Sequence, residues 1–147
     1  MLNAIFFNTP IEDNYLGHQF SEIFKDKVYE PYLGGRKDLI ILDIGGNIGM
    51  ASYYFSSHAK IVHTFEPAKE HFEVITKMLD FNQISNVIPH KMAISNTDGE
   101  QTFYHLQNRT MFSLNPAQVD TTQQHETVKT IRLDTFFKEA LIDHVDF

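Results

Sequence analysis

The sequence predicts an α/β fold with a mostly parallel sheet, and three observations in the first half of the chain support this. An apolar, β-branched run at residues 39–44 lacks the polar alternation of a half-exposed strand, so it is typical of a strand buried on both faces. A glycine-rich turn follows at residues 45–49, and residues 50–58 then contain no helix breaker. A second apolar run at residues 60–65 ends in an acidic residue and a proline. Strand, turn, helix and strand in this order are typical of a nucleotide-binding α/β unit.

The turn and the end of the second strand carry the candidate ligand-binding residues. Asp43 lies in the first strand, and the turn itself contains Gly45, Gly46, Asn47 and Gly49. Glycines allow the backbone to approach a ligand closely, and N–H groups at a helix N-terminus favour a nucleotide-like ligand. Glu66 follows Asp43 by about 20 residues, the spacing at which an acidic side chain can accept hydrogen bonds from the two hydroxyls of a ribose.

A dinucleotide is the less favoured ligand for this turn. The fingerprint of dinucleotide-binding turns is G-x-G-x-x-G, and from Gly45 onward its second and third glycines fall on Asn47 and Met50. The second glycine is the residue that lets the backbone approach a pyrophosphate. The turn therefore disfavours a nicotinamide dehydrogenase, and the acidic Asp43 suits a ligand without phosphates.

Several ordered stretches make the chain similar to one known family. The pattern apolar-Asp43-x-Gly45-x-Asn47-x-Gly49, followed by Phe65-Glu66-Pro67, resembles class I S-adenosylmethionine-dependent methyltransferases. The chain resembles in particular the FkbM-type family, through the further stretches 80–82, 93–95 with 98–99, and 131–135. This resemblance implies a Rossmann-like, three-layer α/β/α fold with strand order 3-2-1-4-5-7-6. It also implies S-adenosylmethionine as the cofactor and O-methylation of a sugar or of a small natural-product hydroxyl.

The resemblance assigns roles to the residues of the turn. Gly45, Gly46 and Gly49 let the backbone approach the methionine and ribose portions of the cofactor. Asp43 orders the turn and bonds the cofactor's amino group directly or through water. Asn47 fixes the loop or contacts the amino-acid moiety. Two alternatives remain open at this stage, namely that the glycine turn only connects a strand to a helix and that Asn47 only forms a turn.

The resemblance also assigns roles to residues after the second strand. Glu66 holds the ribose diol, and Pro67 stiffens the approach to the adenine. The backbone around Ala93 and Ile94 lines the adenine pocket in this resemblance, although the residues themselves favour ordinary core packing over ligand contact. No residue is identified as the catalytic base, because the eight histidines are scattered and none has a metal-ligand spacing. His90, His105, Arg109 and Ser113 are the residues nearest to the expected substrate side.

The remaining segments define one domain, residues 1–147, with an N-terminal helical cap at 1–36 and a cofactor-binding core at 37–147. Helical spacing of apolar residues predicts a helix over about 12–29, ended by Pro31, and another over 68–81. The resemblance places the first of these helices over the pocket, with Tyr29 and Tyr32 near it. Residues 86–94 read as one strand, and Pro89 makes it an edge strand or a bulged one.

The C-terminal third predicts an added β-ribbon and a short helix. Residues 100–106 and 127–133 have strand character and are separated by a long polar loop, 107–126. Asp134 is a candidate N-cap for a helix over 135–141. Residues 144–147 begin another strand. In the resembling family that strand is the fourth of seven, so the sequence predicts an incomplete methyltransferase domain with strands 1–4. An exposed edge at strand 4 invites pairing, so we expect self-association or a partner that covers it.

Composition excludes several other classes of function. The net charge of −7 provides no basic surface for nucleic acid or for an anionic membrane. The absence of cysteine excludes disulfides and thiolate metal sites, and it favours a cytoplasmic protein. No apolar run reaches the roughly 20 residues of a membrane-spanning helix. Two hypotheses follow: a methyltransferase acting on a small-molecule or glycan acceptor, or a non-catalytic truncated Rossmann-like binding or assembly module.

Overall fold

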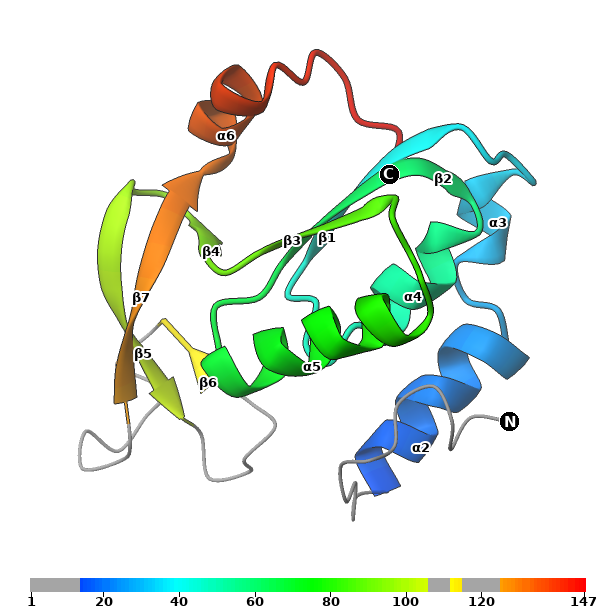
Figure 1. Ribbon diagram of the computed structural model, residues 1–147, viewed down its shortest axis with the longest axis horizontal. Coiled ribbons are helices and arrows are strands. Elements are labelled where there is room, and N and C mark those ends of the chain that lie inside the picture. The colour runs from blue at the N-terminus through cyan, green and yellow to red at the C-terminus, as the bar shows by residue number, and fades with distance from the viewer. Residues whose placement is uncertain (1–13, 106–111, 115–124) are drawn as a thin grey trace.

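Two sheets organise the computed structural model, which describes residues 14–105, 112–114 and 125–147 (Figure 1). The first sheet is parallel with the order β1-β2-β3, and its strands are β1 (Leu39–Ile44), β2 (Ala59–Phe65) and β3 (Val87–His90). The second sheet has the order β4-β7-β5-β6, and its strands are β4 (Ala93–Ser95), β5 (Gly99–His105), β6 (Phe112–Ser113) and β7 (His125–Arg132). The predicted α/β class with a mostly parallel first sheet is therefore confirmed.

The carboxyl ends of the three parallel strands meet at one edge of the first sheet. Ile44 lies beside Phe65, and Phe65 lies beside His90. On the other side of β1, the backbone N–H of Asp146 donates to the carbonyl of Ile40, and the N–H of Leu42 donates to the carbonyl of Phe147, both at 2.9 Å. Residues 146–147 thus occupy the position expected for strand 4 in the order 3-2-1-4.

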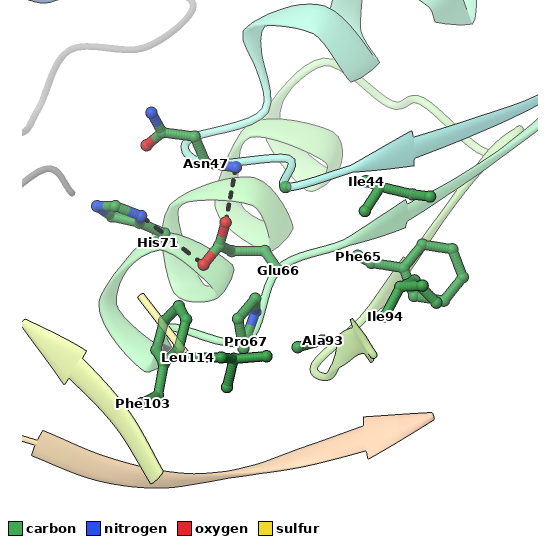
Figure 2. A pocket seen from close by; sticks show the side chains of 11 residues that line it. Ile44, Asn47, Phe65, Glu66, Pro67, His71, Ala93, Ile94, Phe103 and Leu114 are labelled. Carbon is green, nitrogen blue, oxygen red and sulfur yellow. Dashed lines mark hydrogen bonds and ion pairs between the residues drawn. The ribbon is translucent and has the colours of Figure 1, made fainter. Parts of the chain in front are cut away.

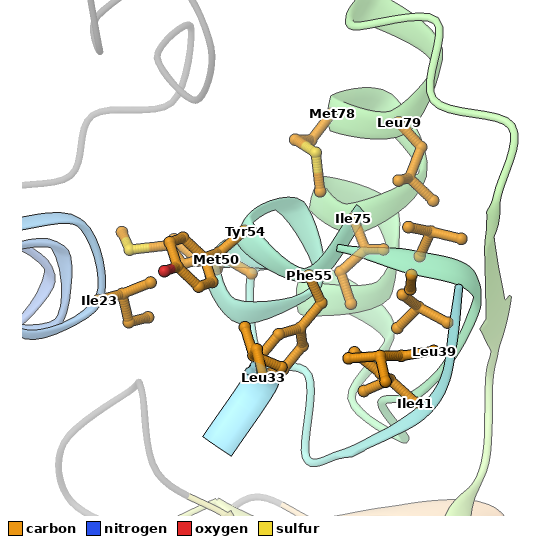
Figure 3. Close-up of a cluster of buried hydrophobic side chains, with 14 residues drawn as sticks. Ile23, Leu33, Leu39, Ile41, Met50, Tyr54, Phe55, Ile75, Met78 and Leu79 are labelled. Atoms are coloured by element: carbon orange, nitrogen blue, oxygen red, sulfur yellow. The ribbon is translucent and has the colours of Figure 1, made fainter. Parts of the chain in front are cut away.

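Helices cover both faces of the first sheet. The helices α4 (Met50–Ser56) and α5 (Lys69–Phe81) lie on one face, and α6 (Leu133–Ala140) lies on the other (Figure 1). The main core fills the space between the sheet and α4 and α5 (Figure 3), with Ile41, Val62 and Ile75 fully buried. On the opposite face, the ring of Phe136 packs edge-on against Phe65 at 4.8 Å. The arrangement is the three-layer, Rossmann-like one that the sequence predicts.

The N-terminal helix is shorter than the sequence predicts. It consists of α2 (Asn14–Phe20) and the π-helical turn η1 (Ser21–Lys25), and the chain then reverses at Lys27, which has a φ of +52°. Pro31 does not end this helix. It lies in the first turn of a separate short helix, α3 (Glu30–Leu33), where its missing N–H would have no intrahelical acceptor.

Aromatic residues after η1 pack beside β1 and away from the sheet edge where the strands end. Tyr29 contacts Phe55 at a ring-centroid distance of 4.9 Å, and Tyr32 stacks on Phe147 at 6.1 Å. Neither Tyr29 nor Tyr32 lines the cavity described below, so the expectation that they lie near a cofactor pocket stays a prediction. The part of the predicted cap before residue 14 lies outside the described residues.

The strand predicted over 86–94 is in fact two strands in different sheets. β3 pairs only with β2, so Pro89 lies on an edge strand as its missing N–H requires. The chain then turns at residues 91–92, where the N–H of Met92 donates to the carbonyl of His90 at 2.9 Å. β4 continues into the second sheet as a parallel neighbour of β7. Local sequence did not show this change of sheet, because the turn at Lys91 and Met92 contains none of the residues that usually mark a turn.

The predicted β-ribbon is confirmed. β5 pairs antiparallel with β7, and Val128 and Thr130 of β7 are buried while Thr127 and Lys129 are exposed. Most of the predicted loop, including Arg109, lies outside the described residues, although residues 112–113 within it form β6 against β5. The part of the chain that the structure describes contains no helix long and apolar enough to cross a membrane.

The predicted cap of α6 is wrong. α6 begins at Leu133, two residues earlier than expected, and Asp134 forms an ion pair with Arg132 at 2.8 Å instead of capping the helix. The hydrogen-bond acceptor at the start of α6 is instead Asp98, which lies in the turn before β5. Its carboxylate accepts from the backbone N–H of Arg132 at 2.6 Å and from the hydroxyl of Thr135 at 2.9 Å. Asp98 thus ties the start of α6 to a distant turn, which local sequence could not reveal.

Candidate functional site

A cavity of about 370 Å³ opens at the edge where β1 and β2 end, between the first sheet and the β-ribbon (Figure 2). Its volume falls in the range of roughly 300–1,000 Å³ typical of small-molecule sites. The lining residues come from both sheets and from α5; they are Ile44, Gly45, Asn47, Phe65, Glu66, Pro67, His71, Ala93, Ile94, Phe103 and Leu114. Its position agrees with the rule that α/β sheets bind ligands at the carboxyl ends of their strands.

The structure brings most of the predicted cofactor-binding residues to this cavity. Those that line it are Gly45, Asn47, Glu66, Pro67, Ala93 and Ile94. Asp43, Gly46 and Gly49 lie behind the lining and hold its shape.

The glycines of the turn divide into two kinds. A Cβ atom at Gly45 would meet nothing within 4 Å, so this residue faces open space, and its φ of +86° favours glycine. A Cβ at Gly46 would lie 2.2 Å from the hydroxyl oxygen of Thr64, and one at Gly49 would lie 2.7 Å from Cε of Met78. A side chain at Gly46 would therefore disturb the packing of β2 against the turn, and at Gly49 the φ of +90° favours glycine. Neither residue lines the cavity.

The backbone N–H groups of the turn are already engaged within the protein. The N–H groups of Gly45 and Gly46 both donate to the carbonyl of Phe65, at 3.0 and 2.9 Å, and that of Gly49 donates to the carbonyl of Gly46 at 2.8 Å. The N–H of Asn47 donates to Oε2 of Glu66 at 2.8 Å. The sequence suggested that these groups would face a ligand. Their engagement instead removes the donors that a phosphate group would need.

Asp43 supports the turn from behind. Its Oδ2 accepts hydrogen bonds from the hydroxyl of Ser52 on α4 and, at 3.4 Å, from the hydroxyl of Thr64 on β2. Burial raises the pKa of the Asp43 carboxyl above its ordinary value. Asp43 therefore joins β1 to α4 and β2, and the cavity lining does not include it. Its predicted role in ordering the turn stays a prediction.

Glu66 is the buried carboxyl group of the cavity. Each of its oxygens accepts one backbone N–H at 2.8 Å, Oε2 from Asn47 and Oε1 from Ala68, so it ties the glycine turn to the start of α5. Burial raises the pKa of Glu66 to about 7, and the charges of Asp43 and Glu126 act in the same direction. A carboxylate has about four acceptor sites, so two remain after these bonds.

Asn47 presents a buried acceptor that no described residue satisfies. Its backbone has a φ of +51°, a conformation that asparagine tolerates better than most residues. Its Oδ1 is buried and has no hydrogen-bond partner within the described parts of the chain. Leaving such an atom unpaired costs about 1–3 kcal/mol, so a ligand that donates to it would stabilise this conformation.

The sequence did not identify five of the lining residues. Ile44 and Phe65 adjoin the motif residues and could have been inferred from them. His71 lies in the first turn of α5, five residues after Glu66. Side chains of a helix tilt toward its N-terminus, so a position near Glu66 could have been inferred for His71. Phe103 and Leu114 belong to the β-ribbon side of the cavity, and nothing in their local sequence indicates that the ribbon folds against the motif.

A pair of histidines lies under α6, and His63 of this pair is buried while His90 is half-buried. Nδ1 of His63 is 3.0 Å from Nε2 of His90, and the ring of Phe136 packs edge-on against both, at centroid distances of 5.3 and 5.1 Å. Burial lowers the pKa of both imidazoles, that of His90 to about 4. His90, a candidate from sequence, does not line the cavity. Nowhere in the described ranges do three or more acidic or histidine side chains gather as a metal site would require.

Comparisons with known proteins give one curated relative and several solved structures. No protein-family model matches the chain. "Methyltransferase 1" of Beauveria bassiana (strain ARSEF 2860) is 33% identical over 89 residues, which cover 56% of this chain and 34% of that protein. The chain thus spans about a third of the length of this relative.

Similar solved structures match part of the chain. Methyltransferase FkbM of Methylobacillus flagellatus KT is 13% identical, with 68% of this chain and 23% of that chain covered and a TM-score of 0.45. The tRNA (m1A58) methyltransferase of Aquifex aeolicus is 25% identical, with 50% and 31% covered and a TM-score of 0.44. A Streptococcus mutans protein in complex with SAH is 20% identical, with 46% and 40% covered and a TM-score of 0.42.

Proposed function

We propose that the chain is part of an S-adenosylmethionine-dependent methyltransferase and that the cavity between Glu66 and Ile94 binds the cofactor. The observation that carries this proposal is the buried carboxyl group of Glu66 at the end of β2, held at the cavity by two backbone N–H groups. Sequence identity of 33% to a protein named as a methyltransferase supports the same class of activity.

The residues present suit the parts of this cofactor. The remaining acceptor sites of Glu66 match a ribose diol, and the unpaired Oδ1 of Asn47 matches a donor such as the cofactor's ammonium group. Pro67, Ala93 and Ile94 supply an apolar wall for the adenine. Gly45 leaves open space where any other residue would place a side chain.

The engaged N–H groups of the turn separate this proposal from a dinucleotide site. A pyrophosphate binds through backbone N–H groups at such a turn, and here those of Gly45, Gly46 and Asn47 are paired within the protein. S-adenosylmethionine has no phosphate, so it does not need them. When bound, it supplies an electrophilic sulfonium methyl group, and the protein contributes mainly by placing the acceptor in line with it.

The methyl acceptor, the cellular location and the association state are further parts of the proposal. We propose O-methylation of a sugar or of a small natural-product hydroxyl, which rests on the resemblance to the FkbM-type family. A cytoplasmic location is favoured by the cysteine-free composition. Self-association, or a partner beside residues 146–147, stays a prediction that sedimentation can test. No catalytic base is assigned.

Isothermal titration of the 147-residue chain with S-adenosylhomocysteine tests the proposal, with NADH as the control ligand. We expect the former to bind and the latter not to bind. Absence of binding to a protein that circular dichroism shows to be folded would contradict the cofactor assignment. Binding without methyl transfer to any hydroxyl acceptor would instead favour the alternative of a non-catalytic binding module.

A further inference from the structure

We propose that His71 is a positioning residue of the cofactor site, which takes up the proton that Glu66 releases when a ribose diol binds. The inference rests on the proposed function and extends it to a residue that the sequence motifs do not include. His71 would act on the cofactor only through Glu66.

The geometry of the pair supports this role. Nδ1 of His71 lies 3.8 Å from Oε1 of Glu66, and both side chains are largely buried, with exposed fractions of 11% and 7% (Figure 2). This distance is longer than a hydrogen bond but short enough for strong attraction between an imidazolium and a carboxylate in a buried site. Both residues line the same cavity, so a ligand there contacts the pair directly.

The charges around Glu66 leave His71 as its positive partner. From β1 the carboxyl of Asp43 faces Glu66, and from β7 the carboxyl of Glu126 does so, and both disfavour a second negative charge. From β3 the contact is a backbone carbonyl, that of His90, which accepts the N–H of Glu66 at 3.1 Å. Among the described lining residues there is no lysine or arginine. On α5, His71 is the group that can become positive beside Glu66.

Diol binding requires the ionised form of Glu66. A carboxylate can accept from both hydroxyls while keeping its bonds to the N–H groups of Asn47 and Ala68, whereas a protonated acid loses one acceptor site to its own hydrogen. The proton leaves the Glu66 carboxyl and adds to Nδ1 of His71, giving a carboxylate and an imidazolium. Burial raises the pKa of Glu66 to about 7, so near neutral pH a substantial share of this carboxyl group carries a proton that it can release.

A pH series of binding constants tests this inference. Isothermal titration with S-adenosylhomocysteine would be done from pH 6 to pH 8 on the wild type, on His71→Gln and on the control His18→Gln, which alters an exposed histidine of α2. In the wild type the proton stays within the Glu66–His71 pair, so the affinity of the protein for S-adenosylhomocysteine should change by no more than about threefold over this pH range. His71→Gln should lose about tenfold between pH 8 and pH 6, because Glu66 must then release its proton to solvent. His18→Gln should follow the wild type.

Two further measurements keep the test independent of folding effects. His71→Lys supplies a permanent positive charge, so its affinity should not fall toward pH 6. Adenosine and 2′,3′-dideoxyadenosine separate the diol from the rest of the ligand, and only adenosine should show the added loss in His71→Gln. A His71→Gln profile that superimposes on the wild type, with S-adenosylhomocysteine bound, would overturn the inference and leave the proposed function standing. Absence of wild-type binding at every pH would overturn both.

Discussion

Two pairs of titratable groups adjoin the end of β2, and only one of them faces a cavity. His63 points to the α6 side of the sheet and pairs with His90 under Phe136. Glu66, three residues later, lines the cavity with His71. Burial shifts the pKa values of Glu66 and His90 toward the neutral form, to about 7 and about 4 respectively. The same physical cause thus acts on both sides of one sheet.

The two pairs differ in what their polar atoms still have to bind. One histidine of the sealed pair can donate to the other, and Phe136 closes the site, so this pair contributes to stability. Glu66 keeps acceptor sites directed at the cavity, where the oxygen of Asn47 also lies buried and unpaired within the described residues. The comparison teaches that a buried titratable group alone does not mark a binding site. Unused hydrogen-bonding capacity beside open space does.

The largest expected effect is on stability and comes from removing the ring of Phe136, which covers His63 and His90. Phe136 is 5% exposed, so Phe136→Ala should lower the free energy of unfolding by about 3–5 kcal/mol. The affinity for S-adenosylhomocysteine should stay unchanged at temperatures where the variant is folded. Urea denaturation measures the first quantity and titration the second. Phe137→Ala, on the same helix but less buried, should cost less stability. Equal costs for the two variants would contradict the role given to Phe136.

The next effect concerns the open space at Gly45. A valine there would project into the cavity, and Gly45→Val should weaken S-adenosylhomocysteine binding by about 2–3 kcal/mol through overpacking. Gly34→Val is the matched control, since Gly34 also has a positive φ and open space but lies in an exposed loop. Both variants carry similar backbone strain, so a difference in affinity isolates the cavity. Unaltered binding in Gly45→Val would rule out this cavity as the cofactor site.

Removal of the carboxyl group should have a smaller effect on binding. Glu66→Ala should weaken S-adenosylhomocysteine binding by roughly 1–3 kcal/mol, because hydrogen bonds to a charged group are lost. Glu70→Ala, which removes an exposed acid from α5, is the control. If Glu66→Ala unfolds because Asn47 and Ala68 lose their acceptor, Glu66→Gln retains one acceptor oxygen and gives the same comparison. Equal affinity in the folded variant and the wild type would show the ribose assignment to be wrong.

The smallest expected effect is a change in the pH dependence of stability. The pKa of His90 is lower in the folded state than in the unfolded state, so the unfolded chain binds more protons between about pH 4 and 6.5. Stability therefore falls as the pH falls through this window. Because His90 is only partly buried, we expect His90→Gln to remove about 1–2 kcal/mol of this fall.

Urea denaturation at pH 4.5 and pH 6.5 checks the effect of His90→Gln. Glu66 has the opposite effect, because its raised pKa makes stability fall as the pH rises from about 4.5 to 7. This contribution is present in both the wild type and His90→Gln, so it cancels in the difference between their pH profiles. Parallel pH profiles for the wild type and His90→Gln would contradict the account of the sealed pair.

Sequence alone predicted the parts of the molecule that depend on neighbouring residues. The strands β1 and β2, the helix α5 and the ribbon of β5 and β7 follow from periodicity and turn residues. The lining residues Gly45, Asn47 and Glu66 follow from the motif. What it missed depends on contacts between distant segments. Asp98 binds the start of α6 from more than 30 residues away, and Phe103 reaches the cavity only because the ribbon folds back against the start of α5.

An NMR titration of ¹⁵N-labelled protein with S-adenosylhomocysteine tests the central claim most directly. If the cavity beside Glu66 binds the cofactor, the backbone amides of Gly45 and Asn47 should shift on addition of the ligand, because one faces the open space and the other is bonded to Glu66. The amides of His63 and Phe136, on the sealed face, should not shift. Shifts confined to the sealed face, or no shifts at saturating ligand, would contradict the assignment of the cavity.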